Sequence, residues 1–318
     1  MYIDLLPWSA LDGSSPRDRF LTLVGAACIG SFVLMYWRRL VREKECSALI
    51  EDMEHQVGGH ARDTTTHMKV YKGRVLKPYQ SNDRGARESA FYAKVHREPT
   101  LAAFVPAYFG EISLPHASPA ARRRRLDIPL ESLCFIAGYL QLEDLVGHMC
   151  SPCIIDVKMG ARSLTPDAPW EKRLREEARY PLQAKLGFRI QGLKVFEPST
   201  QEYTRVDKET CRQFVCRQDV QRAFATFFRP ATAADPLLHS FVEKLRALKA
   251  AFEIHRGYHF VASSLLFVYD AADRRVSDVR LIDFAHVQTD QSTPDAGMLV
   301  GLTNLIAFFE ALPLESSS

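Results

Sequence analysis

The segment at residues 152–160, PCIIDVKMG, constrains the fold most, because it places two charges on an otherwise apolar strand. Successive side chains of a strand point to opposite faces, so Asp156 and Lys158 share one face, whereas Ile155 and Val157 fill the other. Two opposite charges on a buried strand are costly unless a ligand, a metal or each other satisfies them. The segment therefore predicts either a ligand site or a self-satisfied ion pair.

Around this strand, short apolar runs and amphipathic segments follow one another in an order that predicts an α+β fold with two lobes. Two short strands are expected within 68–79, around a turn at Lys72-Gly73. Further strands are expected at 133–142, 153–157, 186–196, 202–206, 265–269 and 279–283. Helices are expected at 87–95, 171–180, 220–228, 236–252 and 295–312, with a Pro- and Arg-rich loop at 113–129.

The charge balance argues against a nucleic-acid partner. The chain has 41 Lys and Arg residues against 38 Asp and Glu residues, which leaves room for a local basic pocket but gives no uniform basic coat. The four arginines at 122–125 read as a solvated insertion, because no aromatic platform accompanies them. Seven scattered cysteines favour a reducing compartment over a disulfide framework.

Residues 20–37 form an uncharged, mostly apolar run. As a helix the run would be about 27 Å long, close to the ~30 Å hydrocarbon core of a bilayer. Tyr36 and Trp37 stand where interfacial aromatics occur, and basic residues follow at once, so the run predicts a signal-anchor with the rest of the chain cytosolic. A buried or interfacial helix is the alternative. A cleaved signal peptide fits less well, since the preceding segment holds Asp4, Asp12 and Asp18, unlike a basic leader, and no clear small-residue cleavage site follows.

Two further segments carry isolated charges at the ends of apolar runs. Lys77 on a strand needs an anionic partner if it faces inward, and Glu88 or a nucleotide phosphate could supply one; otherwise it is an edge-strand lysine in water. Asp283 ends the run at 281–287, LIDFAHV, with His286 three residues on. Such a carboxylate suits Mg²⁺, although capping of the next turn is the alternative.

The helix expected at 171–180 has two distinct faces. One is cationic and would suit a polyphosphate ligand, and it comprises Lys172, Arg175 and Arg179. The other is apolar and comprises Trp170, Leu174 and Ala178. The alternative is a solvated helix stabilised by Lys172–Glu176 and Glu171–Arg175 pairs.

Taken together, these motifs resemble those of the inositol polyphosphate kinases. PCIIDVKMG resembles the family's PxxxDxKxG signature, SSLLFVYD at 263–270 its SSLL motif, and LIDFAHV its IDF motif. The resemblance covers about 57–312, and VLKPYQSNDRGARESAFY is most similar to the multikinase branch. It implies a two-lobed, kinase-like α+β fold with ATP between the lobes. The kinase domain would occupy 46–318, with lobes at about 57–142 and 146–312, after an extension at 1–45.

The resemblance also implies roles for individual residues on the ATP side. Lys77 matches the lysine that contacts ATP phosphates, and Glu88 matches its helix partner. QLEDL at 141–145 matches the hinge, where the backbone of Glu143 and Leu145 would bind adenine. Asp156 matches the carboxylate that binds the ribose hydroxyls.

On the acceptor side, three residues are implied to be catalytic: Lys158 near the transferred phosphate, Asp283 as the Mg²⁺ ligand, and His286 at the inositol phosphate. The residues implied to hold ring phosphates are Lys172, Arg175 and Arg179, with a looser match at Lys208. Multikinases often carry glutamines where this chain has Arg175 and Glu176, and Cys211-Arg212 also departs from the family pattern. These departures bear on the substrate and not on the kinase chemistry.

The function implied is phosphorylation, with ATP and Mg²⁺, of hydroxyls on soluble inositol tris- and tetrakisphosphates by a monomeric multikinase. Its catalytic domain would be cytosolic, with a nuclear pool and a membrane anchor at 20–37. One alternative is an inositol hexakisphosphate or diphosphoinositol kinase. Another is a non-catalytic, membrane-anchored inositol-phosphate sensor, against which the intact Lys77, Asp156, Lys158 and Asp283 argue.

Overall fold

A computed structural model describes residues 50–57, 67–81, 83–117, 134–165, 168–229 and 235–312. Its first sheet has the strand order β1-β2-β3-β5-β4. The strands are β1 (Ile50–Asp52), β2 (Lys69–Tyr71), β3 (Arg74–Pro78), β4 (Tyr108–Ala117) and β5 (Cys134–Glu143). The predicted hairpin is confirmed: β2 pairs antiparallel with β3 through Lys72 and Gly73, both with positive φ, as a tight two-residue hairpin turn requires.

Helix α2 (Arg84–Val95) follows the first hairpin, and the short helix η2 (Ala102–Phe104) comes next. Residues at helical spacing, Glu88, Phe91, Tyr92 and Val95, make up the buried face of α2. A glutamate on this otherwise apolar face needs partners in the interior. The helix begins three residues earlier than the sequence pattern predicts.

The second sheet has the order β11-β10-β6-β7-β8, and its neighbouring strands are antiparallel. The strands are β6 (Pro152–Met159), β7 (Phe188–Glu197), β8 (Glu202–Val206), β10 (Ser264–Asp270) and β11 (Ser277–Ile282). The predicted hairpin near 265–283 is confirmed as β10 and β11. A two-stranded sheet of β9 (Gly257–Phe260) and β12 (Val287–Gln291) was not predicted from sequence.

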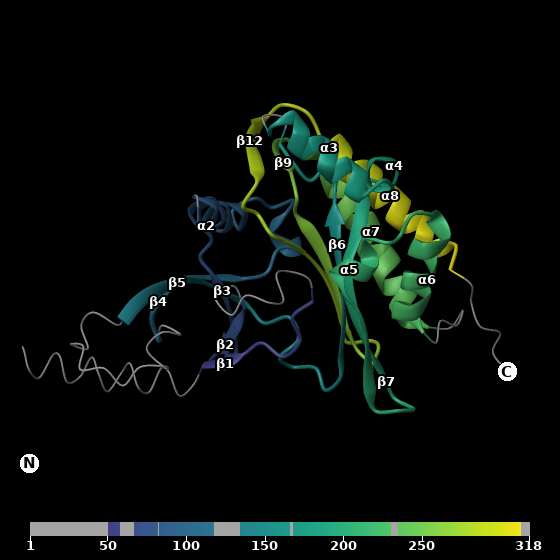
Figure 1. Cartoon of the computed structure of the whole chain (residues 1–318), viewed down its shortest axis with the longest axis horizontal. Coiled ribbons are helices and arrows are strands. Elements are labelled where there is room, and N and C mark those ends of the chain that lie inside the picture. The colour runs from purple at the N-terminus through teal and green to yellow at the C-terminus, as the bar shows by residue number, and fades with distance from the viewer. Residues whose placement is uncertain are drawn as a thin grey trace, which may run out of the picture. The chain divides into compact units, whose positions relative to one another are not determined.

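Helices α6 (Arg217–Phe228), α7 (Pro236–Ile254) and α8 (Ala296–Glu310) lie together on one face of the second sheet (Figure 1). This face carries Ile155 and Val157, both fully buried, and it packs against a dense aromatic cluster. Phe224, Phe228 and Phe267 each meet Phe309 of α8 in edge-to-face geometry. With one face of β6 committed to the core, Asp156 and Lys158 turn to the other face.

Three further helices lie between β6 and α6 in the sequence: α3 (Trp170–Arg179), α4 (Gln183–Leu186) and α5 (Lys208–Cys211). The turn between α4 and β7 passes close to α8. A Cβ atom on Gly187 would lie 2.5 Å from the backbone nitrogen of Gly301, and one on Gly301 would lie 2.3 Å from the carbonyl oxygen of Gly187. Glycine at both positions therefore lets the helix and the turn approach.

Some expectations need correction or fall outside the described residues. The loop predicted at 113–129 is wrong at its start, because β4 continues through Ala117. Pro and Arg composition misled the prediction, since an edge position in a sheet tolerates proline. The arginines at 122–125 and the apolar run at 20–37 lie outside the described residues. Within the described ranges, no helix is long and apolar enough to cross a membrane.

Candidate active site

Lys77 on β3 contacts two carboxylates that come from distant parts of the chain. Its Nζ donates to Glu88 Oε1 at 2.7 Å and to Asp283 Oδ1 at 2.5 Å. Burial alone would lower the pKa of Lys77, but the charges of Asp283 and Glu88 outweigh it and hold that pKa above its usual value. Lys77, Glu88 and Asp283 are called the Lys77 clamp below. The alternative of an edge-strand lysine in water is wrong.

Glu88 closes the clamp from the interior. Its side chain is 1% exposed, and Oε1 accepts a second hydrogen bond, from the backbone N–H of Phe284 at 3.1 Å. Phe284 is itself buried against Phe91 and Tyr92 of α2. The clamp therefore ties α2 to the segment that follows β11, which explains why a carboxylate occupies the buried face of α2.

Asp283, which bonds Lys77 from the segment after β11, has an unusual backbone conformation. Its φ is 67°, in the left-handed region that non-glycine residues seldom adopt. The hydroxyl of Ser263 donates to the Asp283 carbonyl at 2.8 Å and supports this conformation. Burial would raise the pKa of Asp283, but Lys77 and Lys158 lower it below its usual value. The carboxylate is thus ionised and bound to Lys77, and the capping alternative is wrong.

A recess of about 670 Å³, counted with its open mouth, adjoins the clamp. Lys77 and Asp283 stand at one part of its wall, and Glu143 and Leu145 at another. The remaining wall is largely apolar and includes Met53, Val57, Met68, Val75, Leu142, Val146, Ile154 and Leu266. A largely apolar recess lined also by a lysine and a carboxylate suits a purine joined to phosphates.

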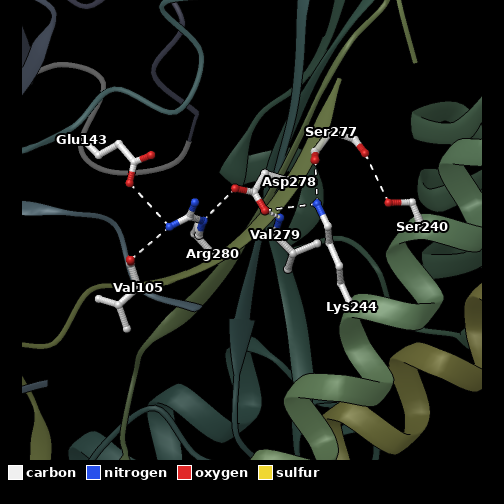
Figure 2. Close-up of polar contacts among 8 residues, drawn as sticks. All are labelled: Val105, Glu143, Ser240, Lys244, Ser277, Asp278, Val279 and Arg280. Atoms are coloured by element: carbon white, nitrogen blue, oxygen red, sulfur yellow. Dashed lines mark hydrogen bonds and ion pairs between the residues drawn. The ribbon is translucent and has the colours of Figure 1, made fainter. Parts of the chain in front are cut away.

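The side chain of Glu143 is held by a polar network that reaches into helix α7 (Figure 2). Arg280 donates from Nη1 to Glu143 Oε2 at 3.4 Å and to the Val105 carbonyl at 3.1 Å, and from Nε to Asp278 Oδ2 at 2.7 Å. Lys244 of α7 donates to Asp278 Oδ1 at 3.2 Å. This hinge network fixes the strand end where Glu143 lines the recess. Arg280 was missed from sequence, because it reads as an ordinary alternating strand residue.

The second sheet presents a polar face beside the clamp. Lys158 of β6 pairs with Ser264 of β10 on one side and with Arg189 of β7 on the other. Asp156 lies two residues before Lys158, on the same face of β6. These four residues are called the polar face. Asp156 is 7% exposed and its Oδ1 has no hydrogen-bond partner, and Ser264 Oγ and Arg189 Nε are likewise buried and unpartnered. Buried polar atoms are normally satisfied, so such a cluster indicates a ligand.

Asp156 and Lys158 do not satisfy each other. No hydrogen bond or ion pair joins them in the described structure, so the self-satisfied pair is wrong. Burial, and then the negative charge of Asp283, raises the pKa of Asp156 to about 6. Burial lowers the pKa of Lys158, against the opposing effects of Asp283 and Asp156. Gly160 directly follows β6 with a φ of 92°, a conformation that explains the final glycine of PCIIDVKMG.

Helix α3 carries the predicted cations but is attached differently than its pattern suggests. None of its residues is fully buried, and Trp170 and Leu174 of the apolar face are 61% and 53% exposed. Glu176 instead turns toward the sheet and accepts from Arg189 at 2.8 Å. The Lys172–Glu176 and Glu171–Arg175 ion pairs of the solvated-helix alternative are not formed within the described structure, where Arg175 Nε donates to the Glu171 carbonyl at 3.4 Å. Arg179 lies 3.8 Å from Glu176, and no contact draws Arg175 toward the polar face.

Positive charge converges on His286. Burial lowers the pKa of His286, and the charges of Arg87, Arg84, Lys158 and Lys172 lower it further. The charges of cations from α2, β6 and α3 therefore act on one imidazole. Arg84 and Arg87 were missed from sequence, because their distance from the PCIIDVKMG and LIDFAHV motifs gives no local signal.

Lys208, the first residue of α5, belongs to the same positive region. Burial is the main cause that lowers the pKa of Lys208, and the positive charges of Arg189 and Arg212 lower it further. The negative charges of Asp156 and Glu176 act in the opposite direction. The predicted acceptor residue Lys208 is therefore near the polar face, whereas the exposed Arg175 is not held there by any contact.

The carboxylates present suit a metal that is bound partly by its ligand. Within the described residues, no group of three or more His, Cys, Asp or Glu side chains could hold a metal ion. Mg²⁺ in nucleotide sites needs no such cage, since one or two carboxylates combine with phosphate oxygens and water. Asp283, ionised and 39% exposed, fits that requirement.

Comparisons with known proteins agree with this geometry. Residues 139–310 match the family model described as inositol polyphosphate kinase. The chain is 32% identical to the inositol polyphosphate multikinase IPK2 of Oryza sativa, covering 80% of this chain and 92% of that protein. The human inositol polyphosphate multikinase is 29% identical, covering 70% of this chain and 51% of its own length.

Solved structures show the same fold. The inositol phosphate multikinase Ipk2 of S. cerevisiae, solved with ADP and Mn²⁺, matches with a TM-score of 0.58 at 22% identity, covering 74% of this chain and 98% of that one. A second multikinase structure matches with a TM-score of 0.53. The fold is that of a two-lobed, kinase-like α+β protein. The chain belongs to the inositol polyphosphate kinase family, which confirms the kinase class expected from sequence.

Proposed function

We propose that this kinase uses ATP and Mg²⁺ to phosphorylate a hydroxyl on soluble inositol tris- and tetrakisphosphates. The observation that carries the proposal is the polar face, whose buried polar atoms without hydrogen-bond partners adjoin the Lys77 clamp. Similarity to plant multikinases extends over 80% of the chain, whereas similarity to the mouse inositol hexakisphosphate kinase 3 covers 53%. This difference supports a multikinase over the hexakisphosphate alternative.

The nucleotide would occupy the recess. The backbone N–H of Glu143 donates to the Ala107 carbonyl at 2.9 Å, so we assign adenine recognition to the Glu143 carbonyl and the Leu145 N–H. Asp156, with Oδ1 unpartnered, would accept from the ribose hydroxyls. Lys77 would bind the phosphates while Glu88 keeps it oriented, and Asp283 would hold Mg²⁺. The ion supplies charge neutralisation to the β- and γ-phosphates.

The acceptor would lie over the other end of the polar face. Lys158, which has no ion pair in the described structure, would neutralise charge on the transferred phosphoryl group. Ring phosphates would meet Lys172, Arg179 and Lys208, and Arg175 would join them if α3 moves on binding. Arg84 and Arg87 of α2 add positive charge near His286. These cations would bind a ring that is already phosphorylated.

His286 would orient the attacking hydroxyl. Because burial and four neighbouring cations lower its pKa, the imidazole is neutral at pH 7 and one ring nitrogen can accept a hydrogen bond. The loose transition state of phosphoryl transfer asks mainly for positioning and charge neutralisation. A neutral imidazole that aligns the hydroxyl meets that need without a strong general base.

A direct assay tests this function. The full chain is incubated with Mg·ATP and a panel of inositol tris-, tetrakis-, pentakis- and hexakisphosphates, and the products are identified by chromatography and NMR. We expect phosphorylation of tris- and tetrakisphosphates, and none from the Asp283→Asn variant. Turnover of the hexakisphosphate alone would favour the alternative kinase, and no turnover with any ring would contradict the proposal.

We also propose, from sequence alone, that 1–45 is an extension to a kinase domain at 46–318 and that 20–37 anchors it to a membrane. The kinase would act as a monomer on the cytosolic side, and a chain lacking the extension could enter the nucleus. Full-length protein should then resist extraction by high salt and alkaline carbonate, and removal of 1–45 should release an active enzyme. Extraction by salt alone would instead indicate an interfacial helix.

A further inference from the structure

Arg189 is a buried cation with an incomplete set of partners. Its side chain is 9% exposed, although it lies on β7 directly opposite Lys158 of β6. Nη1 donates to Glu176 Oε1 at 2.8 Å, and the guanidinium lies 3.4 Å from the centre of the Tyr180 ring. Nε is buried and has no hydrogen-bond partner. A guanidinium is a fork of donors that matches phosphate, and this one is partly unused.

Glu176 is the anion that now occupies this fork. Oε1 bonds Arg189, and Oε2 lies 3.8 Å from Arg179, one of the proposed ring-phosphate contacts. Glu176 is 23% exposed and is carried by α3, a helix without any fully buried residue. A single carboxylate thus neutralises a buried cation and an exposed one where an anionic ring would bind.

The charge of Arg189 is felt across the acceptor region. Burial is the main cause that lowers the pKa of Lys158 and of Lys208, and the charge of Arg189 lowers both further, whereas the Glu176 carboxylate acts to raise the pKa of Lys208. Arg189 therefore shares an electrostatic environment with the residue proposed to neutralise the transferred phosphoryl group. An anion placed beside Arg189 would also lie beside the acceptor ring.

We propose that Arg189 is a specificity-determining residue, a phosphate site that Glu176 masks. The inference rests on the proposed function. A carboxylate repels a phosphate but accepts a hydrogen bond from a hydroxyl. With Glu176 in place, the position facing the pair takes a ring hydroxyl, and rings with a phosphate there are disfavoured. The pair thus selects for less phosphorylated inositols by repulsion.

The test is Glu176→Gln, which keeps the shape of the side chain and removes its charge. Dissociation constants for an inositol trisphosphate and an inositol pentakisphosphate are measured by calorimetry in the Asp283→Asn background, with and without the substitution. We expect Glu176→Gln to tighten pentakisphosphate binding about tenfold, as one new charge-assisted contact would, and to change trisphosphate binding less than twofold. The affinity for ADP should not change.

Two matched variants complete the experiment. Glu177 is the next residue of α3, is exposed and has no ion pair in the described structure. Glu177→Gln should therefore leave the relative affinity for the trisphosphate and the pentakisphosphate unchanged. Adding Arg189→Gln, or Arg189→Lys if that variant is unstable, to Glu176→Gln should abolish the gain. An equal gain in Glu177→Gln, no gain in Glu176→Gln, or a gain that survives loss of the Arg189 fork would overturn the proposal.

The outcome is separable from that of the proposed function. If wild-type enzyme phosphorylates no inositol phosphate, the proposed function fails, whereas the binding preference still reports on the pair. If wild type turns over trisphosphate and the preference does not respond to Glu176→Gln, the masked phosphate site fails alone.

Discussion

The Lys77 clamp and the polar face lie side by side but differ in how their charges are satisfied. In the clamp, Lys77 bonds two carboxylates, and Glu88 accepts from both Lys77 and Phe284. On the polar face, Asp156 and Arg189 each keep a buried atom without a partner. The charges of one region are satisfied within the protein, whereas the other region keeps buried polar atoms that the protein does not satisfy.

The difference teaches how this kinase divides its work. A site that must present a fixed charge to phosphates gains from preorganised partners, because no reorganisation is then needed during the reaction. A site that must accept one ring and reject others gains from donors that remain unsatisfied until the correct ligand arrives. The clamp should therefore govern turnover and stability, and the polar face with α3 should govern substrate choice.

The largest effect should follow Asp283→Asn. The change keeps the shape of the side chain but removes the charge that binds Lys77 and would hold Mg²⁺. We expect kcat to fall about ten-thousandfold, as loss of several kcal/mol of transition-state stabilisation would produce, with the circular dichroism spectrum unchanged. Wild-type-like turnover measured with any active acceptor would remove Asp283 from the mechanism.

Glu88→Ala should be the most destabilising change in the clamp. It leaves the Lys77 ammonium without its buried partner and the Phe284 N–H without an acceptor. Removing one member of a buried pair costs about 3 to 5 kcal/mol, and urea unfolding should show a loss in this range. Glu98→Ala, a change on the turn after α2, is the control. A loss below about 1 kcal/mol for Glu88→Ala would mean that the clamp is not complete within the protein.

The double change Arg175→Glu and Arg179→Glu tests the acceptor side alone. Both side chains are exposed on α3, so the free energy of unfolding should hardly change. KM for the inositol phosphate should rise about a hundredfold, since each lost charge-assisted contact is worth about 1.5 to 3 kcal/mol before solvent screening. KM for ATP should stay within about twofold. Equal effects on both substrates would contradict the division of work, and no effect would return α3 to a solvated helix.

The sequence predicted the elements of both regions but not how they would meet. Period-two and helical patterns located β6, β10, β11 and α2 closely, because each buries one face in the core. The bond between Lys77 and Asp283 joins residues 206 positions apart, and no local pattern encodes it. The attachment of α3 was likewise hidden, because it depends on the contact of Glu176 with Arg189 of β7, whereas the helix pattern shows only a cationic face and an apolar face.

The two regions should also respond oppositely to pH. Burial, and then Asp283, raises the pKa of Asp156 from 3.8 to about 6, so between these values the folded protein keeps a proton that the unfolded chain has lost. Its contribution to stability therefore falls as pH rises from about 4 to 6. Asp283 has a lowered pKa, so its contribution is present above its usual pKa and is lost as pH falls.

The pH contrast is measured by urea unfolding of wild type, Asp156→Asn and Asp283→Asn between about pH 2.5 and 7, a range that extends below the usual carboxyl pKa. Relative to Asp156→Asn, the free energy of unfolding of wild type should fall by on the order of 2 kcal/mol as the pH rises. Relative to Asp283→Asn, the free energy of unfolding of wild type should increase as the pH rises from the acid end of this range. The same slope for both comparisons would show that the polar face carries no unsatisfied carboxylate.

The smallest effect should come from the hinge network, which is complete like the clamp but partly exposed. Arg280→Gln removes the charged donor to Glu143, yet Glu143 Oε2 keeps its bond from the Ala107 N–H at 2.9 Å. The loss of ATP-binding free energy should therefore be only about 1 kcal/mol. KM for ATP should then rise about fivefold, and KM for the inositol phosphate should stay unchanged. Arg275→Gln breaks an exposed pair with Asp273 on the preceding turn and is the matched control, expected to change neither value. If Arg280→Gln altered the inositol phosphate KM instead, the hinge network would act on the acceptor side, and preorganisation would not be confined to the nucleotide side.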